Sequence, residues 1–313
     1  MAQSATAFAP ASIGNLAVGF DMLGLALDGV GDRVRAERTA TAGVSITEVR
    51  GLDGELHAYL PNEPDKNTAS IAAQAFWDEH GNGGGVALSI FKGVPLQSGM
   101  GSSAASAVAA VVAVNALLAA PLPVTELLPY ALEGEKFASG GMHADNVAPS
   151  LLGGMVFCPS NLLPDMLQLP VPEGVSAVLI HPELQVNTAA SRRGLAATVS
   201  REAWLEQQAC FGGFIAACAA NDHKLIRRTL KDVIIEPQRA AAVSCFPAVR
   251  DAAMQAGAFG CSLSGSGPSI FALVAEAQAA NVADVMTASC RKQGIDCQSW
   301  VSSLEAPGAF IES

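Results

Sequence analysis

The sequence predicts an α+β fold with two lobes, and three observations lead to this prediction. Strand-like and helix-like segments are mixed along all 313 residues, and nothing repeats with a period of about 20 to 50 residues. Half of the residues are hydrophobic and 15% are charged, a balance typical of globular chains and unlike disordered or collagen-like ones. A chain of this length lies at the upper limit for one hydrophobic core, so two packed lobes are expected.

The first half of the chain alternates strands with helices. β-Branched residues alternate with other residues in 31–38 and 43–49, which predicts two strands, and the apolar segment 85–91 predicts a third. A helical pattern covers 67–80. Two more helices are expected after the third strand, at 102–119 and 124–138.

An uncharged stretch, residues 93–125, has the length of a membrane span. Pro95, Gly99 and Asn115 interrupt it, and nine of the 19 residues from 102 to 120 are Ala. Membrane spans draw their favourable insertion energy mainly from Leu, Ile, Phe and Val. The stretch is therefore predicted to contain a buried helix, and no membrane association is expected.

The second half of the chain also mixes strands and helices. Strands are expected near 153–157 and 175–182, and helices near 200–220 and 222–232. A closing series of helix, strand, strand, helix and strand is expected at 247–256, 259–263, 269–274, 278–293 and 296–303. A proline-rich segment predicts the lobe boundary near 150–175, with domains at 1–160 and 161–313.

Charge and cysteine content exclude several classes of protein. The chain has 18 Lys and Arg against 29 Asp and Glu, so it lacks the positive field that non-specific binding to nucleic acid or anionic membranes requires. The first basic residue is Arg33, which is unlike a secretory signal or transit peptide, so the cytoplasm is the expected location. The seven Cys contain no CxxC pair and are expected to be reduced core residues, not disulfide partners or zinc ligands.

The strongest local signal is PLQSGMGSSAAS at 95–106, where a glycine-rich turn leads into an Ala-rich helix. Gly99 and Gly101 permit positive φ and close backbone approach, and the first helical turn offers unpaired N–H groups and the positive end of the helix dipole. This pattern predicts an anion site. The alternative is a plain tight turn with Ser102 as the helix N-cap. The candidate residues are Pro95, Leu96, Gln97, Ser98, Gly99, Met100, Gly101, Ser102, Ser103, Ala104 and Ala105.

The predicted anion site is neither a P-loop nor a Rossmann fingerprint. The P-loop pattern GxxxxGK[ST] needs a Lys that the segment lacks, and GxGxxG is not completed. A helix dipole contributes only about 0.3–1 kcal/mol, and up to ~2 kcal/mol when partly buried, so a nucleoside triphosphate also needs a metal ion. The hydroxyl of Ser102 or of Ser103 is a candidate ligand for that ion.

Two further segments complete a set of three motifs. PASIGNLAVGFDMLGLAL lies at 10–27 and GCSLSGSGPSIFALV at 260–274. Together with 95–106 they resemble the three motifs of the GHMP kinases, in the same order and in a chain of similar size. GGMHADNVAPSLLGG at 140–154 and IIEPQR at 234–239 resemble the branch of that family that acts on homoserine.

The resemblance implies a fold and an activity. The implied fold has an N-terminal lobe like the second domain of ribosomal protein S5, with a left-handed β-α-β crossover, and a ferredoxin-like C-terminal lobe. The implied activity is transfer of a phosphoryl group from ATP, with Mg²⁺, to the side-chain hydroxyl of L-homoserine. The alternatives are another kinase of the family, acting on mevalonate or a sugar, and a non-catalytic nucleotide or amino-acid sensor. A homodimer is expected only from its general frequency among oligomers.

The resemblance also implies where the amino acid binds. Asn15 and Asp21 match the family's amino-acid-binding pair, with Asp21 as the partner of the ammonium group. Arg192 and Arg239 match two arginines over the carboxylate, a role in which the guanidinium fork gives bidentate geometry. The alternative role for Asp21 is to cap a helix-like segment at 22–27.

Three residues of the 140–154 motif match positions beside the transferred phosphoryl group. They are His143, Asp145 and Asn146, and it stays open whether Asp145 removes the hydroxyl proton or only orients the substrate. A lone His is more often structural, and only the surrounding motif favours a functional role for this one. Thr188 lies four residues before Arg192, so both are expected on one side of a helix.

The metal and adenine sites are also implied by resemblance. Glu135 matches the family's magnesium carboxylate, and Ser103 is the favoured hydroxyl ligand. Glu133 lies close enough in sequence to be confused with Glu135, but its alternative role is a solvated surface charge. Asn62 falls where the family holds the adenine, beside Asn67 as an expected helix cap.

Overall fold

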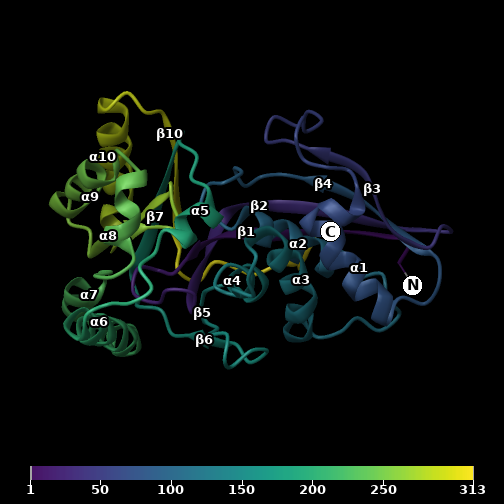
Figure 1. Cartoon of the computed structure of the whole chain (residues 1–313), viewed down its shortest axis with the longest axis horizontal. Helices are drawn as coiled ribbons and strands as arrows, with labels where there is room; N and C mark the ends of the chain where they lie inside the picture. Colours follow the sequence, from purple (N-terminus) through teal and green to yellow (C-terminus); the bar gives the residue numbers. More distant parts are fainter. Residues whose placement is uncertain (1, 313) are drawn as a thin grey trace.

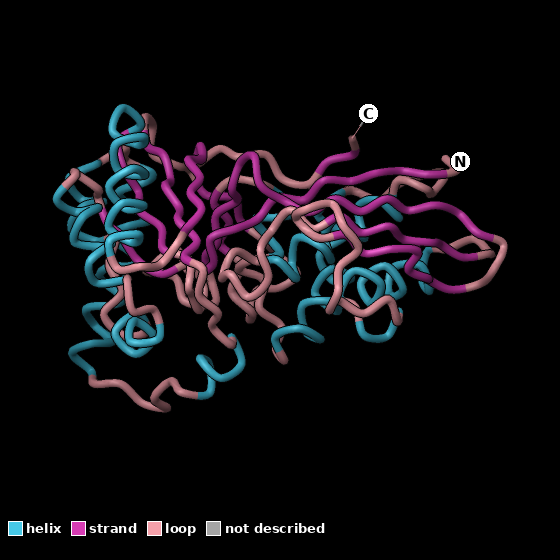
Figure 2. Tube along the Cα trace, turned by 90° about the horizontal axis from the view of Figure 1, so that it is seen from above, coloured by secondary structure: helices cyan, strands magenta, loops and turns pink. Residues whose placement is uncertain are grey.

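The computed structural model describes residues 2–312, which form two lobes that lie side by side, each with a β-sheet and helices packed on it (Figure 1). The first lobe contains a seven-stranded sheet and the second a four-stranded sheet. In the first lobe the helices lie on one side of the sheet (Figure 2). The prediction of a two-lobed α+β fold is confirmed.

The first sheet is built on a long N-terminal pair of strands, β1 (Ser4–Gly14) and β2 (Leu23–Thr39). The main strand order is β11-β1-β2-β4-β3, in which β3 is Gly43–Arg50, β4 is Gly85–Phe91 and β11 is Phe310–Ile311. Strands β3 and β4 are parallel because a helix connects them, and the other neighbours along this order are antiparallel. The glycine-rich segment follows β4 directly, so the sheet fixes where that segment begins.

Four helices cover this sheet: α1 (Thr68–His80), α2 (Ser102–Asn115), α3 (Leu128–Ser139) and α4 (Val147–Leu152). Helix α2 contacts α1, α3, α4, β1 and β2, and all of its residues except Ser103 are buried. Its Ala and Val side chains are small enough for these elements to approach closely. The uncharged stretch thus forms a buried helix, as predicted.

Helix length and cysteine burial can also be compared with the composition. Among the described residues, no helix is both long enough and apolar enough to cross a membrane. All seven cysteines are free and buried, as expected for reduced core residues.

The second sheet has the strand order of a ferredoxin-like fold. Its strands are β7 (Val175–Pro182), β8 (Gly260–Leu263), β9 (Ile270–Ala275) and β10 (Cys297–Ser303). They are antiparallel in the order β10-β7-β9-β8, and helices connect β7 to β8 and β9 to β10, which gives a β-α-β-β-α-β arrangement. The helices of this lobe are α5 (Thr188–Arg193), α6 (Arg201–Ala219), α7 (His223–Thr229), α8 (Glu236–Arg239), α9 (Phe246–Gln255) and α10 (Ala279–Lys292).

Three short strands extend the first sheet from later parts of the chain. Strand β5 (Met155–Phe157) pairs with β2, and β6 (Leu167–Leu169) pairs with β5. Strand β11 returns from the end of the second lobe and pairs with β1. Strands β6 and β11 thus belong to the first sheet although both follow residue 160 in sequence. The domain boundary at residue 160 stays a prediction.

Three local interpretations differ from the structure. Segment 22–27 is not helical, because Leu23 begins β2, so Asp21 caps no helix there. Gly101 is the N-cap of α2, and Ser102 is the first residue of that helix. Strand β1 is absent from the predicted elements, because its run of Ala, Ser and Pro has no alternating pattern.

Candidate active site

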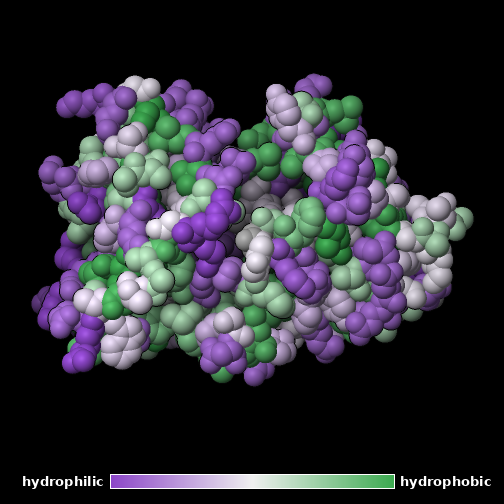
Figure 3. Space-filling model, viewed as in Figure 1, coloured by the Kyte–Doolittle hydropathy of each residue, from purple (hydrophilic) through white to green (hydrophobic). Residues whose placement is uncertain are grey.

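A cavity of about 370 Å³ gathers residues from all three motifs. The space-filling view is hollowed between the two lobes (Figure 3). A cavity of this size suits a small-molecule ligand. The predicted site residues that line it are Asn15, Asp21, Leu96, Gln97, Ser98, Gly99, Gly101, Ser102, Ser103, Glu135, His143, Asp145, Asn146, Thr188, Arg192 and Arg239.

The glycine-rich loop reaches the cavity because two of its glycines adopt left-handed backbone conformations. Gly99 has a φ of +76°, and a Cβ atom there would lie 2.4 Å from the carbonyl oxygen of Ser264. Gly101 has a φ of +67° and is the N-cap of α2, and the first turn of that helix lies in the cavity wall with Ser102 and Ser103. The N–H groups and dipole at this helix end suit a phosphate.

The C-terminal motif packs directly against this loop. The hydroxyl of Ser264 donates to the carbonyl oxygen of Gly99 at 2.6 Å, and the N–H of Ser269 donates to the carbonyl oxygen of Ser98 at 3.1 Å. Gly265 from the same motif lines the cavity. The third motif therefore supports the glycine-rich loop and also lines the cavity.

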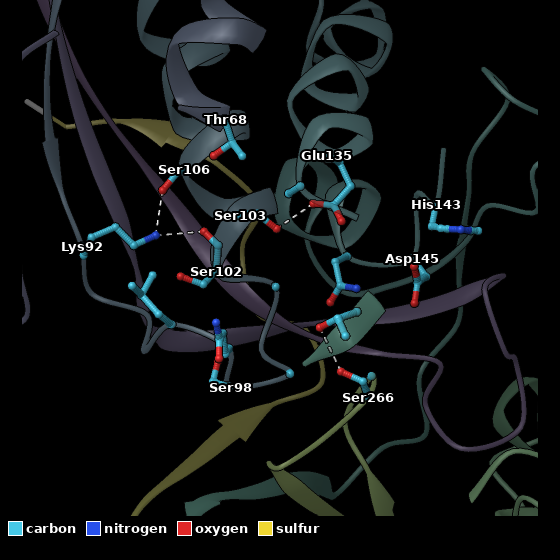
Figure 4. Close-up of a pocket in the computed structure, with 18 of the residues that line it drawn as sticks. Thr68, Lys92, Ser98, Ser102, Ser103, Ser106, Glu135, His143, Asp145 and Ser266 are labelled. Carbon is cyan, nitrogen blue, oxygen red and sulfur yellow. Dashed lines mark hydrogen bonds between the residues drawn. The ribbon is translucent and has the colours of Figure 1, made fainter. Parts of the chain in front are cut away.

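A buried lysine lies beside the loop, although the loop itself contains none. Lys92 pairs with Asp32, and its Nζ also donates to the carbonyl oxygen of Ser102 at 2.9 Å and to Ser106 Oγ at 2.7 Å. Asp32 in turn accepts two backbone N–H groups at the start of the loop, at 2.8 and 3.0 Å. Buried ion pairs need such additional hydrogen bonds to offset desolvation. The pair ties the start of the loop to the first turn of α2, with Lys92 on one side of that turn (Figure 4).

Ser103 and Glu135 meet on the other side of that turn (Figure 4). The hydroxyl of Ser103 donates to Glu135 Oε2 at 2.8 Å. Mg²⁺ in nucleotide sites is typically held by one or two protein oxygens, with phosphate oxygens and water completing its shell. Among the described residues, no group of three or more His, Cys, Asp or Glu is arranged to hold a metal. These two residues therefore fit a magnesium ion that binds together with a nucleotide.

The charged groups that are predicted to bind an amino acid lie elsewhere in the same cavity and pair with each other. Arg192 donates from both terminal nitrogens to the two carboxylate oxygens of Asp21, at 2.7 and 2.6 Å. His143 Nδ1 lies 3.5 Å from Asp21 Oδ2. Burial lowers the pKa of His143 more than Asp21 raises it, so this contact is polar and not ionic at neutral pH. A cation site and an anion site are thus both present, each neutralised by the other.

Asp145 is a buried carboxyl group in the cavity wall. It is 4% exposed, and burial, together with repulsion from Asp21 and Glu135, raises its pKa to about 7. A group with this pKa can accept or release a proton near neutral pH. Gly24 makes room for its backbone, because a Cβ atom on Gly24 would lie 1.7 Å from the carbonyl oxygen of Asp145.

Arg239 and Asn15 converge on the C-terminal motif. Arg239 Nη1 and Asn15 Nδ2 both donate to the carbonyl oxygen of Gly265, at 2.8 and 3.1 Å. Burial and the nearby charge of Arg192 lower the pKa of Arg239. Arg239 is 5% exposed, and its Nε has no hydrogen-bond partner among the described residues.

Two hydroxyl contacts hold the remaining predicted residues. Ser12 donates to Asn146 Oδ1 at 2.9 Å, and the hydroxyl groups of Thr188 and Ser266 lie 3.1 Å apart. Thr188 and Arg192 both line the cavity from α5, as expected for positions one helical turn apart. Ser266 is a further cavity residue that the sequence alone does not reveal.

The turn that carries Asn15 and Asp21 has an unusual backbone. Asn15, Leu16, Ala17 and Asp21 all have positive φ, at 68°, 41°, 59° and 58°. Such conformations are costly for residues with a side chain and are found mainly where a binding site requires them. A hydrogen bond of 3.1 Å from the N–H of Asp21 to Asn15 Oδ1 closes the turn.

Five predicted residues do not line the cavity. One of the five is Asn62, which is exposed. The nearby Asn67 does line the cavity, and it caps α1, as predicted, by accepting the N–H of Ala69 at 3.0 Å. The remaining four, which are buried, are Pro95, Met100, Ala104 and Ala105. On the Asn62 side, the residues that do line the cavity are Leu60, Pro61, Lys66, Asn67 and Thr68.

Two family models match the chain. The model of the GHMP kinases N terminal domain matches residues 67–154, and the model of the GHMP kinases C terminal region matches residues 214–292. The first match contains the glycine-rich loop, Glu135 and Asp145, and the second covers helices α7 to α10.

Full-length relatives agree with these matches. The chain is 41% identical to a homoserine kinase of Xanthomonas campestris over 99% of its own length and 94% of that protein, and 40% identical to one of Chlorobium phaeobacteroides over 99% of both. The crystal structure of a homoserine kinase from Cytophaga hutchinsonii superposes with a TM-score of 0.94 at 40% identity, covering 100% of this chain and 98% of that one. A Lactococcus lactis galactokinase shares the fold, with a TM-score of 0.70 at 15% identity over 98% of this chain and 95% of that one. The chain therefore belongs to the GHMP kinases and, within them, to the homoserine kinases.

Proposed function

We propose that the chain transfers the γ-phosphoryl group of ATP to the side-chain hydroxyl of L-homoserine, forming O-phospho-L-homoserine and ADP, a step of threonine biosynthesis. One observation carries this proposal: a single cavity combines a helix N-terminus suited to phosphate with an Asp and two Arg suited to a zwitterion. Homoserine has one ammonium group, one carboxylate and one primary hydroxyl, so each of these groups finds a partner.

In this proposal the triphosphate binds along the glycine-rich loop. Backbone N–H groups at the start of α2 bind phosphate oxygens, and the buried Lys92–Asp32 pair keeps the loop in place. Ser103 and Glu135 would hold Mg²⁺, and the ion would supply positive charge to neutralise the phosphates. In this proposal the adenosine extends from the loop toward Asn67 and Thr68, which line the same cavity.

Binding of homoserine would replace one ion pair within the protein by two ion pairs between the protein and the substrate. Asp21 and Arg192 neutralise each other in the structure, so neither charge is left unpaired in the partly enclosed cavity. Homoserine separates them by pairing its ammonium group with Asp21 and its carboxylate with Arg192 and Arg239. Because homoserine carries both an ammonium group and a carboxylate, it neutralises both Asp21 and Arg192 after separating them.

The transfer step needs little covalent chemistry from the protein. The hydroxyl oxygen of homoserine forms a bond to the γ-phosphorus while the bond from that phosphorus to the ADP oxygen breaks. Asp145 accepts the hydrogen bond of the hydroxyl and orients it, and its raised pKa also allows it to receive the proton that the hydroxyl loses. Positioning and charge neutralisation supply most of the remaining rate acceleration.

The proposed function is tested by measuring ADP release from ATP with L-homoserine, mevalonate, galactose and shikimate as separate acceptors. We expect activity with homoserine alone and loss of that activity when Mg²⁺ is omitted. Activity with mevalonate or galactose instead would keep the kinase chemistry but overturn the roles of Asp21 and Arg192. ATP binding without activity on any acceptor would favour a nucleotide or amino-acid sensor.

Replacing Arg239 by Ala is expected to raise the KM for homoserine by about 10- to 100-fold, because a charged hydrogen bond to the carboxylate is lost. Steady-state kinetics with each substrate varied in turn would measure this, and the KM for ATP should change little. Arg193→Ala is a matched control, since Arg193 is exposed and does not line the cavity. An Arg239→Ala enzyme with the wild-type KM for homoserine would show that Arg239 does not bind the carboxylate.

A further inference from the structure

One aromatic ring lies against both arginines of the amino-acid site. The guanidinium carbon of Arg192 is 5.4 Å from the centre of the Phe20 ring, and that of Arg239 is 5.2 Å from it. Arg192 comes from α5 and Arg239 from α8, both in the second lobe, whereas Phe20 lies in the turn between β1 and β2 of the first. The ring is therefore a contact that the two arginines share.

The two arginines carry like charges and need something to hold them near each other. Asp21 pairs with Arg192, and the neighbouring positive charge contributes to the lowered pKa of Arg239. The hydrogen bond that Arg239 makes is to a neutral carbonyl group, that of Gly265. An aromatic face attracts a guanidinium group through its quadrupole and carries no net charge. A ring can therefore hold both cations without neutralising them, whereas a second carboxylate would compete with the substrate carboxylate.

The position of Phe20 is fixed by the backbone on either side of it. The N–H of Gly19 donates to the carbonyl oxygen of Asn15 at 2.9 Å, and the N–H of Asp21 donates to Asn15 Oδ1 at 3.1 Å. A Cβ atom on Gly19 would lie 2.4 Å from the Cβ of Leu23, so the chain is closely packed there. These contacts fix the backbone of the turn, and the backbone in turn fixes the position of the Phe20 ring.

Core packing does not explain the ring. Phe20 is only partly buried, and none of the three hydrophobic clusters formed by the described residues includes it, either as a member or as a residue packed against it. Its ring lies against the guanidinium groups of the two arginines. The ring thus has contacts suited to positioning cations more than to stabilising a core.

We propose that Phe20 is a positioning residue that aligns Arg192 and Arg239 for a shared substrate carboxylate, and that it thereby contributes to selectivity for substrates with a carboxylate. This inference rests on the proposed function, because it concerns how the same site distinguishes homoserine from analogues without that charge. It assigns Phe20 no contact with the transferred phosphoryl group.

The test compares Phe20→Leu with Phe20→Trp in the full-length enzyme. The Leu variant keeps an apolar side chain but loses the aromatic face, so the KM for L-homoserine should rise about tenfold. The kcat and the KM for ATP should change little. The Trp variant keeps an aromatic face and should remain close to wild type. Phe8→Leu is the matched control, because the centre of the Phe8 ring lies 5.0 Å from the guanidinium carbon of Arg33, an arginine that does not line the cavity.

A second readout separates positioning from a general loss of structure. L-Homoserinamide replaces the carboxylate with a neutral amide, and the ratio of kcat/KM for homoserine to that for the amide measures selectivity for the charge. This ratio should fall about tenfold in Phe20→Leu and stay unchanged in Phe8→Leu. An unchanged ratio, or an equal rise in the KM values of homoserine and ATP, would overturn the proposal. A wild-type enzyme inactive on homoserine would overturn the proposed function itself, so the two failures are distinguishable.

Discussion

Replacing Asp145 by Asn is expected to lower kcat by about 10²- to 10⁴-fold, the range typical for loss of a positioned proton acceptor. Asn has nearly the same shape, and its side-chain oxygen can still accept the backbone N–H of Asn15 that Asp145 binds. The fold and the KM for ATP should therefore be retained. Asp251→Asn, at an exposed carboxyl group, is the control. Steady-state kinetics at saturating ATP would measure the effect.

The pH dependence tests the same residue independently. Burial raises the pKa of Asp145 to about 7, so its deprotonated fraction, and with it kcat/KM, should rise through neutral pH and level off above about pH 8. In Asp145→Asn this rise should disappear. A folded Asp145→Asn enzyme with most of the wild-type kcat and an unchanged pH profile would contradict the assigned role.

Stability should change with pH in the opposite sense. The carboxyl group of Asp145 binds its proton more tightly in the folded state than in the unfolded state, so wild-type stability falls as the pH rises from about 4 to about 7. The Asn variant carries no such charge. Its Tm should therefore exceed that of the wild type by a larger margin at about pH 8 than at about pH 5. Thermal melts at both pH values would measure the difference.

Replacing Glu135 by Gln is expected to lower kcat by about 10²-fold and to raise the Mg²⁺ concentration needed for half-maximal activity. Gln keeps an oxygen for the hydroxyl of Ser103 but removes the negative charge that a divalent ion requires. A Mg²⁺ titration at fixed ATP would measure both effects. Glu133→Gln is the control, because Glu133 is on the same helix but pairs with Lys136 at the surface.

Two results would contradict the metal site. An unchanged Mg²⁺ requirement in Glu135→Gln would show that this carboxylate does not hold the ion. An equal shift in Glu133→Gln would show that the effect arises from the general charge of α3 and not from the contact between Ser103 and Glu135.

The conformation of the glycine-rich loop was the most predictable part of the candidate site, because it depends on local geometry. A glycine-rich turn before an Ala-rich helix specifies a helix N-terminus wherever it occurs, and Gly99 and Gly101 do adopt positive φ. Motif resemblance identified Glu135, and the structure brings it within hydrogen-bond distance of Ser103. The roles of these residues in binding remain predictions.

The parts that escaped prediction depend on contacts between distant segments. Lys92 and Asp32 are 60 residues apart, and they meet because β2 and β4 pair in register. Similarly, the sequence indicates the charges of Asp21 and Arg192 but not that they pair with each other across 171 residues. Periodicity reports only on neighbours along one element, so contacts of this kind are visible only once the fold is known.

Strand β1 shows a different limit. Its residues are buried from Ala7 to Gly14 without alternation, and Pro10 within it argues against a strand. The structure accommodates Pro10 next to a register shift between β1 and β2. A strand that is covered on both faces loses the two-residue period by which strands are recognised.

The pairing of β11 with β1 bears on how the chain is synthesised. Strand β1 is translated about 300 residues before Phe310–Ile311, the partner on its outer edge. At about 5–20 residues per second, a ribosome needs roughly 15–60 s to reach that partner. During this interval the first lobe can fold around β2 while β1 still exposes an unpaired edge, which is a template for association with other nascent chains. Chaperone protection during translation should therefore matter most for this edge, and truncation before residue 310 should promote aggregation even though it removes no residue of the active site.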